Sequence, residues 1–415
     1  MWENVLAGDP GHKQLRAGTD RAEPLSETLA RAQSVAPAVG LTRIADITGL
    51  DHVGIPVAAA YRPNARSVSV SQGKGPTLLA ARVSAAMEAI EGYHAERVAA
   101  PLRLGTVREM ASRPDTADLQ SLPRTTTPLQ AGAKLLWLEA HDLTRDQPRW
   151  LPLEVVQTDF TLPVVGCSGA FVMSSNGLAS GNHRLEALSH GLSELIERDA
   201  NSLWHHASPR ERAARRVAPE GCADPTVREV LAKFAAADVA VAVWETTSDV
   251  GVACFLCEVA DRRARALAPL PPTTGSGCHP RREVALLRAL TEAAQGRLTR
   301  IAAVREDLDD RLYSPAEAAA RVEVFLRDVV TAEVPRAFEA APTWDASTFA
   351  DDVRWQLERL ARVGLDTALV VDLTHPALGI PVVRVVVPGL ESMAELPNVA
   401  PGKRAQAWKT AQSAR

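Results

Sequence analysis

Apolar and polar positions recur along the chain with two different periods, and their order predicts a mixed α/β protein. Alternation with a period of two predicts strands in residues 42–50, 55–63, 65–73, 134–143, 149–159, 169–177, 239–248, 252–260, 367–375 and 381–389. Apolar positions three to four apart predict helices in residues 24–40, 78–98, 183–206, 282–304, 315–330 and 349–363, and in a segment that starts near residue 226. Because strands and helices interleave without a regular βαβ cadence, we expect a single mixed α/β (α+β) domain over residues 1–415, not a doubly wound sheet.

Three of the predicted helices begin directly after segments rich in glycine or serine, which we expect to be loops. These segments are GKGPT (73–77), SNGLASGN (175–182) and PPTTGSGCHP (271–280). Such loops can present backbone N–H groups and a helix N-terminus to a phosphate group. The sequence contains none of the patterns GxxxxGK[ST], GxGxxG, GxSxG and HExxH. A nucleotide site in this chain would therefore differ from the P-loop and from the dinucleotide fold.

The helix predicted over 183–206 carries acidic side chains on one face. Glu186, His190, Glu194 and Glu197 are spaced by four, four and three residues, so they fall within an arc of roughly 80°. A lone pair of this kind usually marks a solvated acidic stripe, but here apolar residues cover the rest of the helix: Leu185, Leu188, Leu192, Leu195 and Ile196. Since like charges at this spacing destabilise a helix by a few tenths of a kcal/mol per pair, the stripe calls for a compensating cation.

Two other helices add charged groups at similar spacing. Glu88 and Glu91 share a face of the helix after GKGPT, and Arg288, Glu292 and Gln295 share a face of the helix after PPTTGSGCHP. The alternative for the second set is an ordinary surface ion pair. Oxygen ligands of this type suit Mg²⁺, which binds through a few carboxylates, waters and phosphate oxygens. The pattern therefore favours a magnesium–nucleotide site.

The cysteines favour neither zinc nor disulfide bonds. Cys254 and Cys257 form a CxxC pair inside a predicted strand, without a second pair of ligands. Five scattered cysteines in 415 residues are typical of reduced thiols.

Charge and hydropathy narrow the partners. The net charge is -4, with 46 basic and 50 acidic residues, so there is no general positive field for nucleic acid or an anionic membrane. No run of about 18 apolar residues and no signal-like start is present. We expect a cytoplasmic protein that binds a small ligand or a peptide.

Five sequence blocks, in order, resemble the YcaO family. They are the SxxxExxE pattern of Ser84, Glu88 and Glu91, then SNGLASGN (175–182), Glu186 with SELIERDA, ALTEAAQGRL, and GIPVVRVVVPGLE. The resemblance covers roughly residues 18–395, and a polar tail follows from about residue 398. It implies a fold that holds ATP and Mg²⁺ between carboxylate-bearing helices.

The resemblance also implies roles for individual residues. The implied magnesium ligands are Glu88, Glu91, Glu186, Glu194 and Glu197. The implied nucleotide-binding residues are Arg21, Thr28, Ser84, Asn182, Arg198, Glu292 and Gln295. Arg198, Glu194 and Glu197 are the implied catalytic residues. Arg21 and Thr28 keep the seven-residue spacing at which the family often has a lysine and a serine.

The reaction implied by the resemblance is attack on a peptide backbone amide whose oxygen takes up the γ-phosphoryl group of ATP. A side-chain nucleophile gives an azoline, an external sulfide a thioamide and an amine an amidine. The chain lacks the Pro-rich ending common in azoline-forming members and most resembles members that work beside a TfuA protein, so we expect a thioamide and a partner protein. The alternatives are an azoline-forming cyclodehydratase, a non-catalytic accessory factor for ribosomal-protein methylthiolation, and a small-molecule ligase or kinase. A homodimer is compatible with the sequence but not indicated by it.

Overall fold

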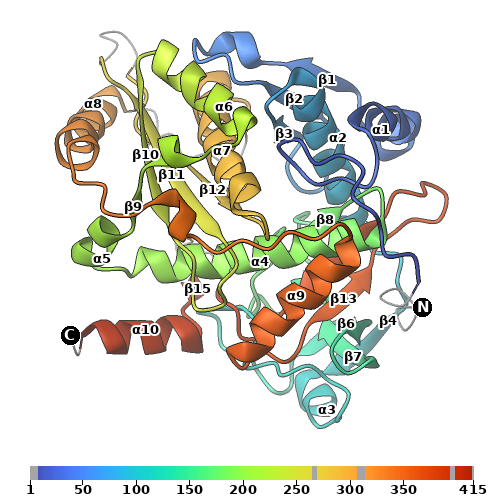
Figure 1. Ribbon diagram of the computed structural model, residues 1–415. Helices are drawn as coiled ribbons and strands as arrows, with labels where there is room; N and C mark the ends of the chain where they lie inside the picture. Colours follow the sequence, from blue (N-terminus) through green and yellow to red (C-terminus); the bar gives the residue numbers. More distant parts are fainter. Residues whose placement is uncertain (1–7, 264–268, 306–313, 393–397, 414–415) are drawn as a thin grey trace.

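Three antiparallel sheets of three or more strands, one two-stranded sheet and ten α-helices are the main elements of the described part of the chain. The computed structural model describes residues 8–263, 269–305, 314–392 and 398–413 (Figure 1). The first sheet has the order β1-β2-β3, from Arg43–Asp46, Val57–Tyr61 and Val70–Lys74. The second has the order β12-β11-β10-β9, from Thr273–Cys278, Cys254–Asp261, Val239–Glu245 and Arg216–Val217. The third has the order β4-β6-β13-β14-β8 with β7 beside β6, from Leu102–Thr106, Lys134–Asp142, Leu369–Asp372, Val382–Val386, Leu178–Ser180 and Gln147–Pro152.

The helices lie between and around these sheets, and the prediction of a mixed α/β fold is confirmed. In chain order they are α1 (Leu25–Val39), α2 (Leu78–Ala95), α3 (Val107–Ala111), α4 (Arg184–His205), α5 (Pro209–Ala214), α6 (Pro225–Ala236), α7 (Arg282–Ala302), α8 (Pro315–Val324), α9 (Phe349–Arg362) and α10 (Lys403–Ser413). A short pair of strands, β5 (Arg124–Thr125) and β15 (Val399–Ala400), joins two distant segments. Within the described residues, the structure has no helix whose length and apolarity would suit a transmembrane span.

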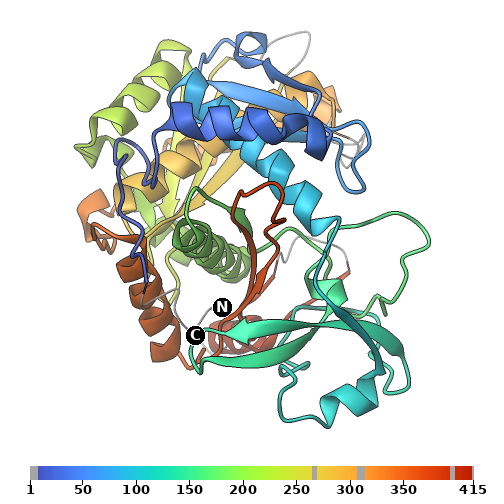
Figure 2. The same cartoon turned by 90° about the vertical axis from the view of Figure 1, so that its right-hand side faces the viewer.

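Helix α4 lies at the centre of the molecule. It runs across the middle of Figure 1, with the first and second sheets above it and the third sheet below, and Figure 2 shows it almost end-on. Its apolar side, which includes Leu185, Leu188, Leu192 and Ile196, is fully buried in a core shared with α9, β13 and β14. The apolar residues seen in the sequence thus fix the helix against the third sheet, and the acidic stripe is left for the other side.

Two strand-and-helix units repeat one arrangement. The first unit is β1–β3 followed by α2, and the second unit is β10–β12 followed by α7. In each unit a glycine of the last strand lets the helix approach: a Cβ atom on Gly73 would lie 2.0 Å from the nitrogen of Ala85, and one on Gly277 would lie 2.1 Å from the oxygen of Ala285. Only glycine permits such a close approach of helix and strand. In both units the contacts are made with the residues eight and twelve positions after the glycine, so α2 and α7 lie at equivalent positions on their strands.

The sequence prediction is wrong for some elements. Residues 271–280 were expected to be a loop, but they contain β12, whose small side chains allow α7 to pack closely on the strand. Residues 169–177 were expected to be a strand. They form a loop instead, because Gly169 and Gly177 have positive φ angles and Glu154 accepts a hydrogen bond from the backbone N–H of Phe171. Strand β4, α3 and, in the polar tail, α10 were not predicted.

Candidate nucleotide and magnesium site

The polar faces of α2, α4 and α7 meet above the centre of α4. We call this group the carboxylate centre; its members are Glu88 and Glu91 of α2, Glu194, Glu197 and Arg198 of α4, Arg288 and Glu292 of α7, and Lys74 of β3. Several of these side chains remain accessible: the exposed fraction is 28% for Glu292, 25% for Arg198 and 21% for Lys74. A ligand can therefore reach groups that are otherwise enclosed by protein.

The α7 side of the carboxylate centre is rich in cations. Lys74 Nζ lies 2.6 Å from Glu292 Oε2, and Arg198 lies 3.3 Å from both Glu194 Oε1 and Glu197 Oε1. Burial acts to raise the pKa of Glu292, but Lys74, Arg198 and Arg288 lower that pKa to about 2. Glu292 is consequently ionised at neutral pH.

The α2 side has the opposite character. Burial raises the pKa of Glu88 to about 7 and the pKa of Glu91 to about 8, and repulsion from Glu194 adds to both shifts. These carboxylates lack enough nearby positive charge to stay fully ionised. A bound cation would supply it.

Glu91, Glu194 and Glu197 each accept hydrogen bonds from the protein. Ser180 donates its backbone N–H (2.8 Å) and its hydroxyl (2.6 Å) to Glu91 Oε1. The backbone N–H of Gly177 donates to Glu194 Oε2 (2.9 Å), and the Ser276 hydroxyl donates to Glu197 Oε1 (2.9 Å). Among the described residues, no three His, Cys, Asp or Glu side chains converge as a ready-made metal site. Because Mg²⁺ usually keeps waters and phosphate oxygens as ligands, a few carboxylates beside a nucleotide suffice.

Unpaired polar atoms support this fit. Glu197 Oε2, Arg198 Nε, Arg288 Nε and Gln295 Oε1 are buried and have no hydrogen-bond partner within the described chain. Such atoms are rare in folded proteins and call for an ion, a water or a ligand. They include donors and acceptors on two helices, as a magnesium–nucleotide complex requires, so the residues fit this group.

Glu186 lies apart from the carboxylate centre, toward the start of α4. Eleven residues separate it from Glu197, which is about 16 Å along a helix. Its Oε2 accepts from the backbone N–H groups of Asn182 (3.1 Å) and Ala22 (3.3 Å), and Arg21 Nε lies 3.7 Å from its Oε1. The structure therefore brings Arg21, Asn182 and Glu186 together at one end of the stripe. Their nucleotide and magnesium roles stay predictions.

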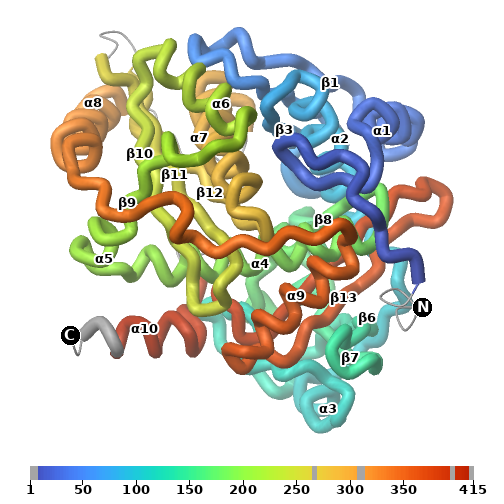
Figure 3. The backbone as a smooth tube through the Cα atoms, in the orientation of Figure 1, coloured from blue at the N-terminus to red at the C-terminus, as the bar shows by residue number. Residues whose placement is uncertain are grey.

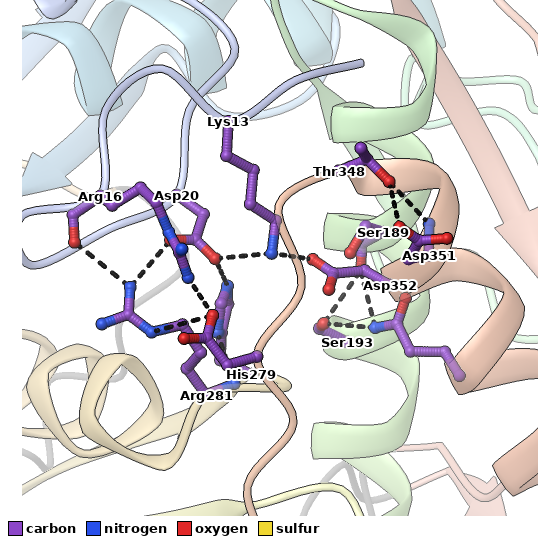
Figure 4. A network of polar contacts seen from close by, with 12 residues as sticks. Lys13, Arg16, Asp20, Ser189, Ser193, His279, Arg281, Thr348, Asp351 and Asp352 are labelled. Atoms are coloured by element: carbon purple, nitrogen blue, oxygen red, sulfur yellow. Dashed lines mark hydrogen bonds and ion pairs between the residues drawn. The ribbon is translucent and has the colours of Figure 1, made fainter. Parts of the chain in front are cut away.

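A buried ion network anchors the N-terminal segment that carries Arg21. Lys13 Nζ lies between Asp20 (2.9 Å) and Asp352 of α9 (2.6 Å), and all three side chains are fully buried (Figure 4). Arg281 Nη1 donates to Asp20 Oδ1 at 2.9 Å. Figure 3 shows the N-terminal chain running beside the segment that leads into α9, where the backbone N–H of Lys13 donates to the oxygen of Ser347. The network thus fixes the approach of Arg21 to α4.

Two predicted nucleotide contacts lie at the edge of this arrangement. The Thr28 side chain is buried in α1 and donates to the backbone oxygen of Pro24. Ser84 lies one turn before Glu88 on α2 and is partly exposed. The sequence pattern assigns no role to Lys74 or Ser276. The GKG segment is a signal for Lys74, whereas Ser276 lies in a segment that the sequence predicts to be a loop.

Comparison with known proteins places this site in a family. A family model described as "YcaO cyclodehydratase", ATP- and Mg²⁺-binding, matches residues 72–391. The chain belongs to the YcaO family. The family resemblance predicted from the sequence is thereby confirmed, and ATP and Mg²⁺ are the cofactors of this family, whose members are ATP-dependent enzymes.

Relatives extend over almost the whole chain. An uncharacterized protein encoded in the tfuA 3′ region of Rhizobium leguminosarum bv. trifolii is 35% identical over 398 residues, which cover 93% of each chain. An uncharacterized protein of Methanothermobacter thermautotrophicus is 38% identical over 370 residues, covering 88% of this chain and 94% of the relative.

Solved structures share the YcaO fold. YcaO from Methanopyrus kandleri, bound with AMPPCP and Mg²⁺, has a TM-score of 0.71 and 26% identity, with 92% of this chain and 94% of that chain covered. A heterocyclase in complex with substrate and cofactor has a TM-score of 0.73 and 22% identity. The match covers 93% of this chain and 54% of the heterocyclase, so the chain spans about half of that protein.

Proposed function

We propose that this YcaO protein uses ATP and Mg²⁺ in the cytoplasm to activate a backbone amide of a peptide or protein, and that the product is a thioamide made together with a TfuA-like partner protein. The observation that carries the proposal is the pairing, in one centre, of under-compensated carboxylates on α2 with a cation-rich face on α7. One side suits a divalent cation, and the other suits the negative charge of a nucleotide.

The residues divide the work by charge. Glu88, Glu91, Glu194 and Glu197 would hold Mg²⁺, and Arg198, with Lys74 and Arg288, would neutralise the phosphate groups. ATP supplies, when bound, the phosphoryl group that turns the amide oxygen into a leaving group. Transfer of this kind depends mainly on positioning and charge neutralisation, which is what this arrangement offers.

Helix α10 is tied to the central helix of the site. Its Arg404 lies 2.9 Å from Asp199, which follows Arg198 on α4, and also pairs with Asp249. The preference for a thioamide over an azoline rests on the resemblance to family members that work beside a TfuA protein. The tfuA-region relative supports a partner of the TfuA type.

The alternatives make different predictions. An accessory factor without chemistry would have no need of a repulsive carboxylate cluster such as Glu88 with Glu91. An azoline-forming enzyme would remove water from the peptide without a need for sulfide. A small-molecule ligase would leave the peptide mass unchanged.

Intact-mass measurement separates these outcomes. Enzyme, partner protein, ATP, Mg²⁺ and sulfide are incubated with a peptide encoded beside the gene. We expect replacement of one oxygen by one sulfur, and little modification when the partner is omitted. Loss of one water from the peptide without sulfide dependence would contradict the proposal that the product is a thioamide. Processing of the peptide by the isolated enzyme would contradict the proposal that a partner protein is required.

A further inference from the structure

His190 lies in the acidic stripe on α4, and neither the family resemblance nor the proposed function assigns it a task. It lies one turn after Glu186 and one turn before Glu194, and its side chain is partly exposed. Each of these carboxylates accepts a hydrogen bond from a backbone N–H group. Among the described residues, none forms a hydrogen bond or ion pair with the His190 imidazole. Its ring nitrogens are thus available to a ligand or a reactant.

Basic groups from four elements act electrostatically on the ring. They are Arg288 of α7, Arg21 of the N-terminal segment, His279 between β12 and α7, and Lys74 of β3. On its own helix the nearest charged neighbours along the stripe are Glu186 and Glu194. Burial lowers the pKa of His190 well below its ordinary value, and the basic groups lower that pKa further. The imidazole is therefore neutral at pH 7 and has a free lone pair.

Two simpler roles fit the surroundings less well. A structural core histidine usually has a partner, as His94 does: its Nδ1 lies 2.7 Å from the backbone oxygen of Ile90. A magnesium ligand is expected to be an oxygen, because Mg²⁺ is a hard cation. The His190 imidazole is neutral and has no partner within the described part of the chain, and the basic groups near it do not protonate it. It is therefore suited to accept a proton from a reactant.

We propose that His190 is the general base that takes the proton of the nucleophile attacking the activated amide. This inference rests on the proposed function. With hydrosulfide (HS⁻) as the nucleophile, a carbon–sulfur bond forms, and the activated oxygen leaves as phosphate with the electron pair of its carbon–oxygen bond. The S–H bond then breaks, its electrons complete the C=S double bond, and the proton goes to a ring nitrogen of His190. Atoms and charges balance, with ATP and sulfide as the co-reactants.

The first test is chemical rescue. His190→Ala should slow peptide modification by about 10²–10⁴-fold, and added imidazole should restore part of the rate. The dissociation constant of Mg·AMPPCP should stay within about threefold of wild type. His205→Ala is the matched control, because His205 is an exposed histidine in the last turn of the same helix. A rate near that of wild type would overturn the proposal, as would nucleotide affinity that falls in parallel with the rate.

The second test needs no turnover and uses the nucleotide-free wild-type protein. Diethyl pyrocarbonate acylates neutral imidazole, so labelling of a reference histidine peptide falls about tenfold between pH 7.5 and pH 5.5. Labelling of His190, followed by peptide mass spectrometry, should change little over this range. A tenfold fall at His190 would show that the ring is protonated and would overturn the proposal, even where the alanine variant fails to fold.

The two tests separate the inference from the proposed function. If the wild-type protein with its partner leaves the peptide unmodified, the proposed function fails, and labelling still decides whether His190 is a neutral, reachable base. If the wild-type protein modifies the peptide and His190→Ala does so equally well, only the inference fails.

Discussion

The first and second strand-and-helix units share a backbone arrangement but have opposite electrostatics. Glu88 and Glu292 each lie fifteen residues after the glycine on which their helix packs. Burial raises the pKa of Glu88 to about 7, whereas Lys74, Arg198 and Arg288 overcome burial at Glu292 and lower its pKa to about 2. The difference comes from neighbouring cations and not from the carboxylates themselves. One scaffold used twice can thus build a cation-binding side and an anion-binding side of a single centre.

The position three residues further along each helix extends the contrast. It is Glu91 on α2 and Gln295 on α7. Glu91 adds a third carboxylate beside those of Glu88 and Glu194. Gln295 instead is neutral, and its Nε2 donates a hydrogen bond to the backbone oxygen of Gln72 at 3.0 Å. Lys74 belongs to the first unit but pairs with Glu292 of the second. Each variant below changes one side of this comparison.

The largest effect is expected from α4, which serves both sides. Glu194→Ala or Glu197→Ala should lower ATP turnover by at least about 10²-fold, because charge-stabilising groups of an active site contribute this much. The fold should stay intact, and the melting temperature of the ligand-free protein should rise as repulsion is relieved. Turnover is measured with substrate and partner present, and unfolding by calorimetry.

Glu229→Ala is the control for this experiment, since Glu229 forms an exposed surface pair with Lys233 on α6. Unchanged ATP hydrolysis in both α4 variants would contradict the proposed roles. A large loss of stability in the ligand-free protein would point to a structural role instead.

The next effect concerns the cation shared by the two units. Lys74→Met should weaken ATP binding by about 10–100-fold, equivalent to roughly 1.4–2.8 kcal/mol, because a positive charge is lost beside the phosphate groups and Glu292 loses its ion pair. Lys233→Met is the matched control on the surface. Isothermal titration calorimetry with AMPPCP and Mg²⁺ measures the change. Equal affinities in the two variants would show that Lys74 pairs with Glu292 but does not contribute to nucleotide binding.

The sequence predicted the helices of this site better than the contacts between them. Helical spacing placed Glu186, His190, Glu194 and Glu197 on one face, because a period of 3.6 residues is a local property. Burial and partners are not local. The link from Lys74 to Glu292 spans 218 residues, so spacing within either segment could not predict it.

The family resemblance added ligand roles but could not say how the ligand-free side chains lie. It grouped Glu186 with Glu194 and Glu197, whereas the structure holds Glu186 at the N-terminal end of α4 beside Arg21. Strand β12 was taken for a loop because its residues, Thr273 to Cys278, are small and lack apolar alternation. Its strand character comes from pairing with β11, which is a long-range contact.

A smaller effect should follow from making the two units more alike. Glu91→Gln gives α2 the side chain that α7 has at the matching position, and it should weaken Mg²⁺ binding by about tenfold. Gln295→Glu makes the reverse change and should weaken ATP binding without altering the Mg²⁺ requirement. Titrations of Mg²⁺ at fixed AMPPCP, and of AMPPCP at fixed Mg²⁺, separate the two. The comparison breaks down if both variants affect the same titration.

The smallest effect is a pH dependence that belongs to the α2 side. The pKa values of Glu88 and Glu91 rise from the ordinary glutamate value of 4.5 to about 7 and about 8 in the folded protein. Between the ordinary and the raised values the folded state binds more protons than the unfolded state, so stability falls as the pH rises. Asp352, with a pKa of about 6, has finished most of its titration below pH 6.5. Histidines with a lowered pKa, such as His190 and His279, act with the opposite sign near pH 6.5 because their rings take up protons in the unfolded state. The contribution of the α2 side is therefore read as the difference between the wild-type protein and Glu91→Gln in the window from pH 6.5 to pH 8.

We expect Glu88 and Glu91 together to lower the unfolding free energy of the ligand-free protein by on the order of 2 kcal/mol across this window. Glu91→Gln should remove most of this loss. The pKa of Glu91, about 8, lies at the upper end of the pH window, so Glu91 contributes more than Glu88, and a glutamine side chain does not ionise. Saturating Mg²⁺ with AMPPCP should flatten the dependence, since a bound cation stabilises the ionised carboxylates at every pH in the window. Gln295→Glu, on the cation-rich α7 side, should leave the slope as in wild type. If wild type and Glu91→Gln instead showed the same slope from pH 6.5 to pH 8 without ligand, Glu91 would already be compensated within the protein, and the electrostatic contrast between the two units would fail.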